Sequence, residues 1–175
     1  TITKAGNYTL KVKEATAISD VSGSRNIRVL PAKQFGVAYG EVTASSDPDH
    51  GYFEDATFSY TPGKVKEFVL NVVDEFGNKL AGSQVERAAT TYALVFKPGD
   101  AGYADIRETE SGGGSGSYTL KVEYPKNTYR VYVVAGSYDT EAPELEIWTF
   151  TDQNENGKID TGELDTLIQV IKFSK

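Results

Sequence analysis

The chain contains no cysteine and no methionine, and it has only one histidine and one tryptophan in 175 residues. Without cysteine, no disulfide stabilises the fold, and cysteine usage says nothing about the redox compartment. Nucleophilic and metal-assisted catalysis rely mostly on His or Cys. The single His50 lies in an acidic turn, where a solvated side chain is the expected state. We therefore expect a protein that is not an enzyme.

Long apolar runs and an excess of positive charge are also missing. No run of eighteen apolar residues occurs, so no segment is long enough to cross a bilayer as a helix. The 18 Lys and Arg residues are outnumbered by 25 Asp and Glu residues, which gives a formal net charge of −7 and a pI near 4.8. This balance argues against nucleic acid and against an anionic membrane surface as partners.

An initiator methionine is absent, and the chain begins Thr1-Ile2-Thr3. Removal of a signal peptide is the simplest explanation, and trimming of a recombinant chain is the alternative. The first explanation predicts a secreted protein of the extracellular cell surface. In that setting Asn7, within Asn7-Tyr8-Thr9, is an acceptor for N-linked sugar.

Alternation of apolar and polar residues is abundant, and the 11 Tyr and 8 Phe residues, with many Val and Thr, favour strands. Clusters of Gly, Pro, Asn and Asp separate the alternating segments, and no long helix is expected between them. The pattern predicts one all-β domain over residues 1–175, an antiparallel β-sandwich or jelly roll of about ten strands. The predicted strands are Tyr8–Lys13, Asn26–Leu30, Gln34–Thr43, Tyr52–Tyr60, Lys66–Val73, Thr90–Lys97, Tyr103–Glu108, Ser117–Tyr124, Thr128–Ala135 and Glu144–Thr151.

One segment carries recognisable chemistry, the twelve residues Asp152 to Glu163. Oxygen side chains stand at segment positions 1, 3, 5, 9 and 12, and glycine stands at position 6. Calcium is a hard cation that takes six to eight oxygen ligands, and Gly157 supplies the sharp turn that lets the alternating oxygens face inward. The segment resembles the EF-hand calcium loop. The ligands that the resemblance implies are Asp152, Asn154, Asn156, Lys158 through its backbone carbonyl, Asp160, and Glu163 through both carboxylate oxygens.

The resemblance to EF-hand proteins ends at the loop. Calmodulin-like proteins and dockerins carry two such loops, whereas this chain has one. The segment before the loop alternates like a strand, so the usual entering helix is absent. Sensor function and cohesin binding therefore do not carry over. A lone loop with three acidic ligands fits the weak extracellular class, with a dissociation constant of about 10⁻⁴ to 10⁻³ M, so Ca²⁺ is expected as a structural clasp. A polar surface turn is the alternative interpretation.

After the loop, Leu164, Leu167, Ile168 and Ile171 follow the i, i+3, i+4, i+7 spacing of a helix. This spacing predicts a helical turn or short helix from Thr161, becoming extended near Ile171. The content of β-branched residues in Leu167–Phe173 leaves a strand as the alternative.

Two further sequence features leave alternatives open. The segment Gly6–Val12 returns as Gly116–Val122, which indicates either duplicated or exchanging strands or simply a favourable strand sequence. The stretch Ser111–Gly116 has the composition of a flexible linker, and it suits a hairpin tip, a domain junction or an engineered loop.

The segment Val69–Val85 is similar to the strand-turn opening of bacterial Ig-like surface modules.

Three weaker candidates for chemistry remain. Carboxylate pairs for glycoside hydrolysis meet only in the fold. Acidic residues around residue 50 suit a second calcium site, although solvated turn residues are more common. Aromatic side chains suit a sugar-binding face, although core packing is the more common use. The acidic residues are Asp47, Asp49, Glu54 and Asp55, and the aromatic residues are Tyr129, Tyr132, Tyr138 and Trp148.

The sequence as a whole favours a calcium-stabilised structural protein of the cell surface, a subunit of a filament, layer or appendage that associates with itself. In one version a terminal strand, Thr1–Val12 or Leu167–Lys175, completes the sheet of a neighbouring subunit. The alternatives are a carbohydrate-binding or adhesin module of a larger surface protein, with a glycan as partner, and the soluble head of a pilin.

Overall fold

The structure is a computed structural model that describes residues 1–13, 22–46, 51–97, 104–137, 142–160 and 162–175. Within these residues the chain forms eleven strands and one short 3-10 turn, η2 (Gly82–Gln84). The strands are β1 (Gly6–Lys13), β2 (Ser22–Val29), β3 (Gln34–Tyr39), β4 (Ala56–Ser59), β5 (Lys66–Asp74), β6 (Thr90–Lys97), β7 (Ala104–Arg107), β8 (Ser117–Val122), β9 (Thr128–Ala135), β10 (Glu144–Phe150) and β11 (Leu164–Ser174).

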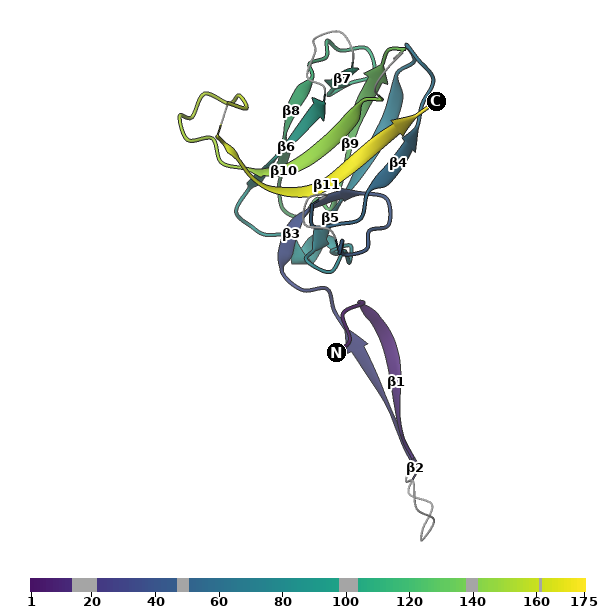
Figure 1. Ribbon diagram of the computed structural model, residues 1–175. Helices are drawn as coiled ribbons and strands as arrows, with labels where there is room; N and C mark the ends of the chain where they lie inside the picture. The colour runs from purple at the N-terminus through teal and green to yellow at the C-terminus, as the bar shows by residue number, and fades with distance from the viewer. Residues whose placement is uncertain (14–21, 47–50, 98–103, 138–141, 161) are drawn as a thin grey trace.

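Two sheets form a sandwich, and a third sheet stands apart from it (Figure 1). The sandwich consists of a five-stranded sheet in the order β4-β11-β10-β6-β8 and a four-stranded sheet in the order β3-β5-β9-β7. All paired strands are antiparallel except β11 and β4, which are parallel. The predicted all-β sandwich is confirmed, and each of the ten predicted strands is present. Among the described residues, no helix has the length and apolar content needed to cross a membrane.

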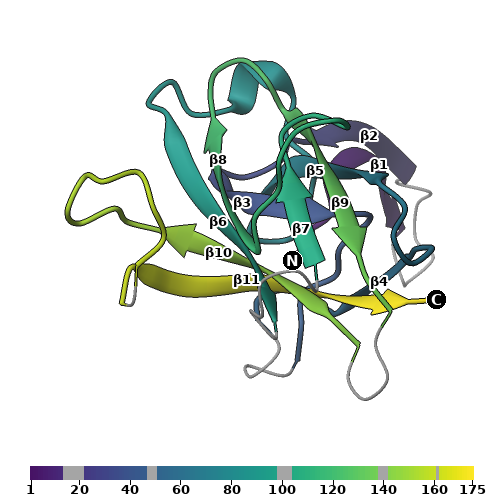
Figure 2. The same ribbon diagram turned by 90° about the horizontal axis from the view of Figure 1, so that it is seen from above.

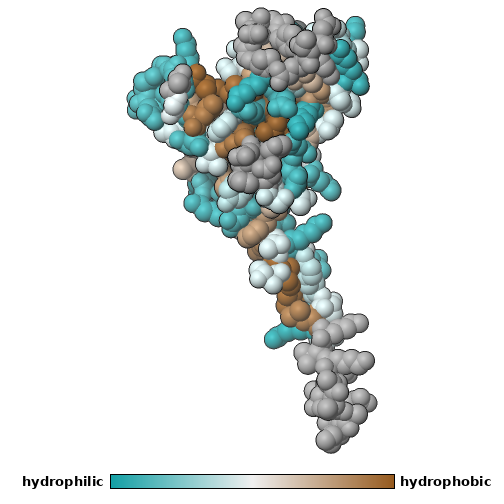
Figure 3. All heavy atoms as spheres, viewed as in Figure 1, coloured by the Kyte–Doolittle hydropathy of each residue, from teal (hydrophilic) through white to brown (hydrophobic). Residues whose placement is uncertain are grey.

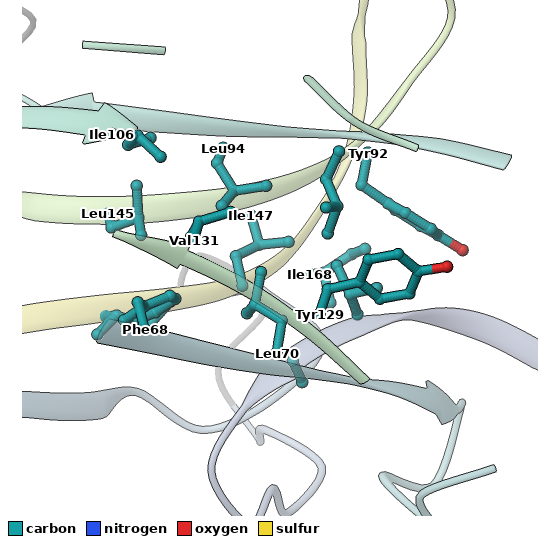
Figure 4. Close-up of a cluster of buried hydrophobic side chains, with 14 of the residues drawn as sticks. Phe68, Leu70, Tyr92, Leu94, Ile106, Tyr129, Val131, Leu145, Ile147 and Ile168 are labelled. Carbon is teal, nitrogen blue, oxygen red and sulfur yellow. The ribbon is translucent and has the colours of Figure 1, made fainter. Parts of the chain in front are cut away.

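The core lies between the two sheets and follows from the alternation that predicted the strands. Along β9, Tyr129, Val131, Val133 and Ala135 are buried, while the residues between them are at least partly exposed. Leu94 and Ile147 of the five-stranded sheet and Phe68, Leu70 and Val131 of the four-stranded sheet point toward one another (Figure 4). Burying each such side chain contributes about 1.5–3 kcal/mol, so this layer is the main source of stability.

The helix predicted after the loop is wrong and the alternative, a strand over Leu167–Phe173, is confirmed, because Leu164–Ser174 is the long strand β11. Ile147 pairs with Gln169 and Trp148 pairs with Leu167, which leaves Ile168 as an extra residue, a β-bulge. The extra residue shifts the alternation by one position, so Ile168 and Ile171 both enter the core although they are three residues apart. The bulge thus reproduces the spacing of a helix within a strand. Thr161 lies outside the described residues.

A buried amide joins the two sheets beside this bulge. Gln169, on β11, is 1% exposed. Its side-chain oxygen accepts a hydrogen bond from the backbone N–H of Tyr39 at 2.9 Å, and its side-chain nitrogen donates to the Tyr39 carbonyl at 3.3 Å. The edge strand β3 is thereby attached to the opposite sheet.

The third sheet is the two-stranded ribbon β1–β2, which we call the arm, and it extends away from the sandwich (Figure 1). Its base is held by the turn after β5. The fully buried Asp74 carboxylate accepts the N–H of Ala32 at 2.8 Å, on the chain leaving the arm. The Asn78 side chain accepts the N–H of Ala5 at 2.8 Å and donates to the Thr3 carbonyl at 2.8 Å, on the chain entering it. Asp74 also accepts from the Asn78 side chain at 2.9 Å, so both chains of the arm are attached to one turn.

The glycine-rich stretch Ser111–Gly116 carries the chain from β7 in one sheet to β8 in the other. It is hydrogen-bonded to β7, because Ile106 and Ser115 exchange both backbone bonds, at 2.7 and 3.2 Å. A Cβ atom on Gly114 would lie 2.5 Å from Cβ of Asp105, closer than packed atoms approach. The neighbouring Gly113 has no atom within 4 Å of the equivalent position. This segment is therefore a packed inter-sheet connection in which one glycine is required by contact.

We predict that Gly114→Ala lowers the free energy of unfolding by about 1–3 kcal/mol, because the added methyl group overlaps β7. Gly113→Ala is the matched control, and it leaves the stability unchanged or raises it by up to about 1 kcal/mol through the unfolded state. Urea unfolding of the two variants measures the difference. Equal stabilities would show that the connection does not pack against β7 as described.

Candidate metal centre

The segment Asp152–Glu163 forms the loop between β10 and β11, two neighbouring strands within the five-stranded sheet. It extends sideways from the sandwich in two perpendicular views (Figure 1, Figure 2). The N–H of Thr151 donates to the Glu163 carbonyl at 3.1 Å and closes the base of the loop. Gly157 has a φ of 71°, which is the left-handed conformation that glycine adopts without a Cβ penalty. The glycine predicted to make the turn therefore makes it.

The first half of the loop folds around the carboxylate of Asp152. One of its oxygens accepts the N–H of Asn156 at 3.1 Å, and the other accepts the N–H of Gly157 at 2.7 Å. The side-chain oxygens of the two asparagines accept backbone N–H groups two residues further on, from Asn156 to Asn154 at 3.1 Å and from Lys158 to Asn156 at 2.7 Å. These Asx turns wind the backbone tightly and leave the Lys158 side chain exposed.

The last predicted ligand, Glu163, is the most buried of the described loop residues at 4% exposure. One carboxylate oxygen accepts the N–H of Gln153 at 3.0 Å, and the other accepts the N–H of Asp160 at 2.9 Å. Each oxygen has a further lone pair, so both remain able to bind a cation. Glu163 therefore connects the beginning of the loop, its end and the start of β11.

Asp160 receives the amide groups of both asparagines. One of its oxygens accepts from the side-chain nitrogen of Asn154 at 2.9 Å and from that of Asn156 at 2.7 Å. These hydrogen bonds, and to a smaller degree the charge of Lys158, hold the pKa of the Asp160 carboxyl below its ordinary value of 3.8. The five predicted side-chain ligands are thus brought together in one hydrogen-bonded loop.

The chemistry of this donor set fits a hard cation. Three carboxylates, two amides and a backbone carbonyl offer oxygen alone, which is what Ca²⁺ prefers. Each asparagine oxygen that accepts a backbone N–H has a second lone pair, so it can also serve a cation. Within the described residues, no three His, Cys, Asp or Glu side chains cluster as a metal site. In this loop amide and carbonyl oxygens complete the donor set, and the amides separate the acidic groups.

The described residues of the two other predicted sites do not come together as a site. Tyr129 is in the core, Tyr132 alternates to the outer side of β9, and Trp148 belongs to the other sheet, so these three make no sugar-binding face. For the second calcium site, Asp55 instead forms an ion pair with Lys172 at 2.8 Å. Asp47, Asp49, His50 and Tyr138 lie outside the described residues.

Two buried charges are not among the residues that the sequence singled out: Asp74 at the base of the arm, which is 0% exposed, and Glu146 on β10, which is 7% exposed. The Glu146 carboxylate accepts the Trp148 indole N–H at 2.7 Å and pairs with Lys97 at 2.8 Å. The alternation Glu144-Leu145-Glu146-Ile147-Trp148 already places Glu146 and Trp148 on one side of the strand. Because the Glu146 carboxylate is paired with Lys97 and hydrogen-bonded to Trp148, it stabilises the outer side of the sheet.

We predict that in calcium-free buffer the Asp160 carboxyl titrates below pH 3.8, because the two amide donors stabilise its charged form. A lowered folded-state pKa contributes stability that is present above the ordinary Asp pKa of 3.8 and is lost as the pH falls from there through the lowered pKa. Asn156→Ala should raise the pKa, whereas Gln153→Ala, which keeps both amide donors, should not. Carboxyl ¹³C NMR titration measures the midpoints. A midpoint at or above the ordinary value would contradict the loop geometry.

Comparison with known proteins finds no matching family model, no matching curated protein and no matching solved structure.

Proposed function

We propose that this chain is a calcium-stabilised structural protein of the cell surface, a subunit of a filament, layer or appendage. The observation that carries the proposal is the position of the oxygen-rich loop. It joins the adjacent strands β10 and β11, and its buried ligand Glu163 directly precedes β11.

In this proposal the oxygen side chains of the loop bind the cation, and the bound cation stabilises the conformation of the loop. Calcium supplies the positive charge that offsets the three carboxylates of Asp152, Asp160 and Glu163. The backbone N–H groups already donated to Asp152 and Glu163 orient these carboxylates before any ion binds. At a free calcium concentration about ten times the dissociation constant, binding stabilises the fold by about 1.4 kcal/mol. An increment of this size suits a permanent clasp in calcium-rich surroundings.

Self-association is supported by the different pairing of the two terminal strands. Leu167–Lys175 falls largely within β11, which is hydrogen-bonded to β10 along one edge and to β4 along the other. Thr1–Val12 includes most of β1, which pairs with β2 alone in the described part of the chain. Of the two candidate strands, the N-terminal one therefore has an edge and a face available for a neighbouring subunit.

We predict that millimolar Ca²⁺ raises the melting temperature of the protein and that Glu163→Gln abolishes this rise. The variant removes the one acidic ligand that offers two buried oxygens. Glu155→Gln is the matched control, since it makes the same change of charge in the same loop at an exposed position outside the donor set. Scanning calorimetry with calcium and with chelator measures the shifts. If calcium does not change the melting temperature of the wild-type protein, the calcium proposal is wrong.

Assembly is tested separately by negative-stain microscopy of the wild-type protein in calcium and in chelator. Ordered assemblies in calcium are expected. Monodisperse particles in both solutions would contradict the proposed filament or layer. The proposed calcium clasp is tested independently by the calorimetry.

A further inference from the structure

The arm has one apolar face and one polar face. Directly opposite residues of an antiparallel pair lie on the same face, so the pair Tyr8–Ile27 and its neighbours Leu10 and Val29 share one side. Arg25, opposite Leu10, is the one charged residue among these pairs and adds a positive charge to the apolar face. The alternate pairs share the other side, and they are polar: Asn7 with Arg28 and Thr9 with Asn26. Leu10 is 50% exposed, and hydrophobic residues are visible along the arm in the space-filling view (Figure 3).

The same strand sequence occurs elsewhere in the chain with its apolar side covered. Tyr8-Thr9-Leu10-Lys11-Val12 returns as Tyr118-Thr119-Leu120-Lys121-Val122 in β8, an edge strand of the sandwich. There the leucine is 4% exposed, because it packs into the core. In the arm the equivalent Leu10 remains half exposed. The arm therefore presents the sequence of a core-covering strand without a core beneath it.

An isolated two-stranded ribbon is marginally stable in water, so burial of this face would stabilise the arm. The arm is not free to turn back at its base, since Asp74 and Asn78 bond both of its chains. Its apolar face is thus held away from the sandwich of its own chain, as Figure 1 shows.

Charge indicates what covers the apolar face. Residues 1–30 contain five Lys and Arg and two Asp and Glu, a formal charge of +3. Residues 31–175 contain thirteen Lys and Arg and twenty-three Asp and Glu, a formal charge of −10. Two arms would repel each other, whereas an arm and a sandwich attract each other over about 10 Å at ordinary ionic strength.

We propose that the apolar face of the arm docks on the acidic sandwich of a second copy of this chain. The contact is head-to-tail, because the surface that docks differs from the surface that receives it. Repetition of such a contact gives a ring if the rotation closes and a filament if it does not. The inference rests on the proposed self-assembly and names the surface that performs it.

The test uses Leu10→Ser with Ile27→Ser on the apolar face, and Thr9→Ser with Asn26→Ser on the polar face as the matched control. Sedimentation velocity in calcium, over a range of protein concentrations and of salt, measures association. Loss of the two apolar side chains should weaken association by about 100-fold, whereas the control should assemble like wild type. Association of the wild type should weaken with added salt. The melting temperature of each variant checks that the sandwich is intact.

A mixing experiment distinguishes arm-to-sandwich contact from arm-to-arm contact. The apolar-face variant, labelled with a fluorophore, keeps an intact sandwich and should co-sediment with unlabelled wild type by accepting its arm. Absence of co-sedimentation would overturn the head-to-tail contact in favour of pairing between arms. Assembly that persists in the apolar-face variant would overturn the inference and leave the proposed function standing. A wild type that stays monomeric in calcium would overturn the inference together with the assembling role.

Discussion

Hydrogen bonding along both edges of β11 is the constraint on which the rest of the sandwich depends. β10 lies antiparallel on one side and β4 lies parallel on the other, so the C-terminal segment is an interior strand of the five-stranded sheet. From this position its bulge sends Ile168 into the core and Gln169 to the edge strand β3. Removing the strand would uncover the core and detach the two sheets at once.

The loop before β11 matters to the sandwich because β11 is hydrogen-bonded along both edges. A polar turn on an edge strand could move without consequence, but here Glu163 is buried where an interior strand begins. Its carboxylate bonds backbone groups at both ends of the loop. Whatever stabilises these carboxylates therefore acts on the strand that joins the sheets, so even a weak cation site would suffice for the structural role that we propose.

The arm and the loop are each held in place at the base by a buried carboxylate. In each, a buried carboxylate accepts backbone N–H groups from two segments, Asp74 at the base of the arm and Glu163 at the base of the loop. Neither segment has enough apolar burial of its own to determine its direction. Oriented hydrogen bonds to buried acceptors supply the direction, since a buried carboxylate without partners would be strongly destabilising.

The sequence by itself determined ten of the eleven strands and the pattern of oxygen side chains in the loop, because alternation and loop chemistry are local properties. Thr90–Lys97 and Thr128–Ala135 are predicted with the bounds that the structure has, and the candidate ligands of the loop lie within twelve residues. Only the tertiary structure decided which sheet each strand joins and how β11 folds. The spacing of Leu164, Leu167, Ile168 and Ile171 favours a helix until the bulge opposite Ile147 and Trp148 is known. The arm shows the same limit, because Leu10 and Leu120 occupy identical local sequences and differ only in what long-range contacts place above them.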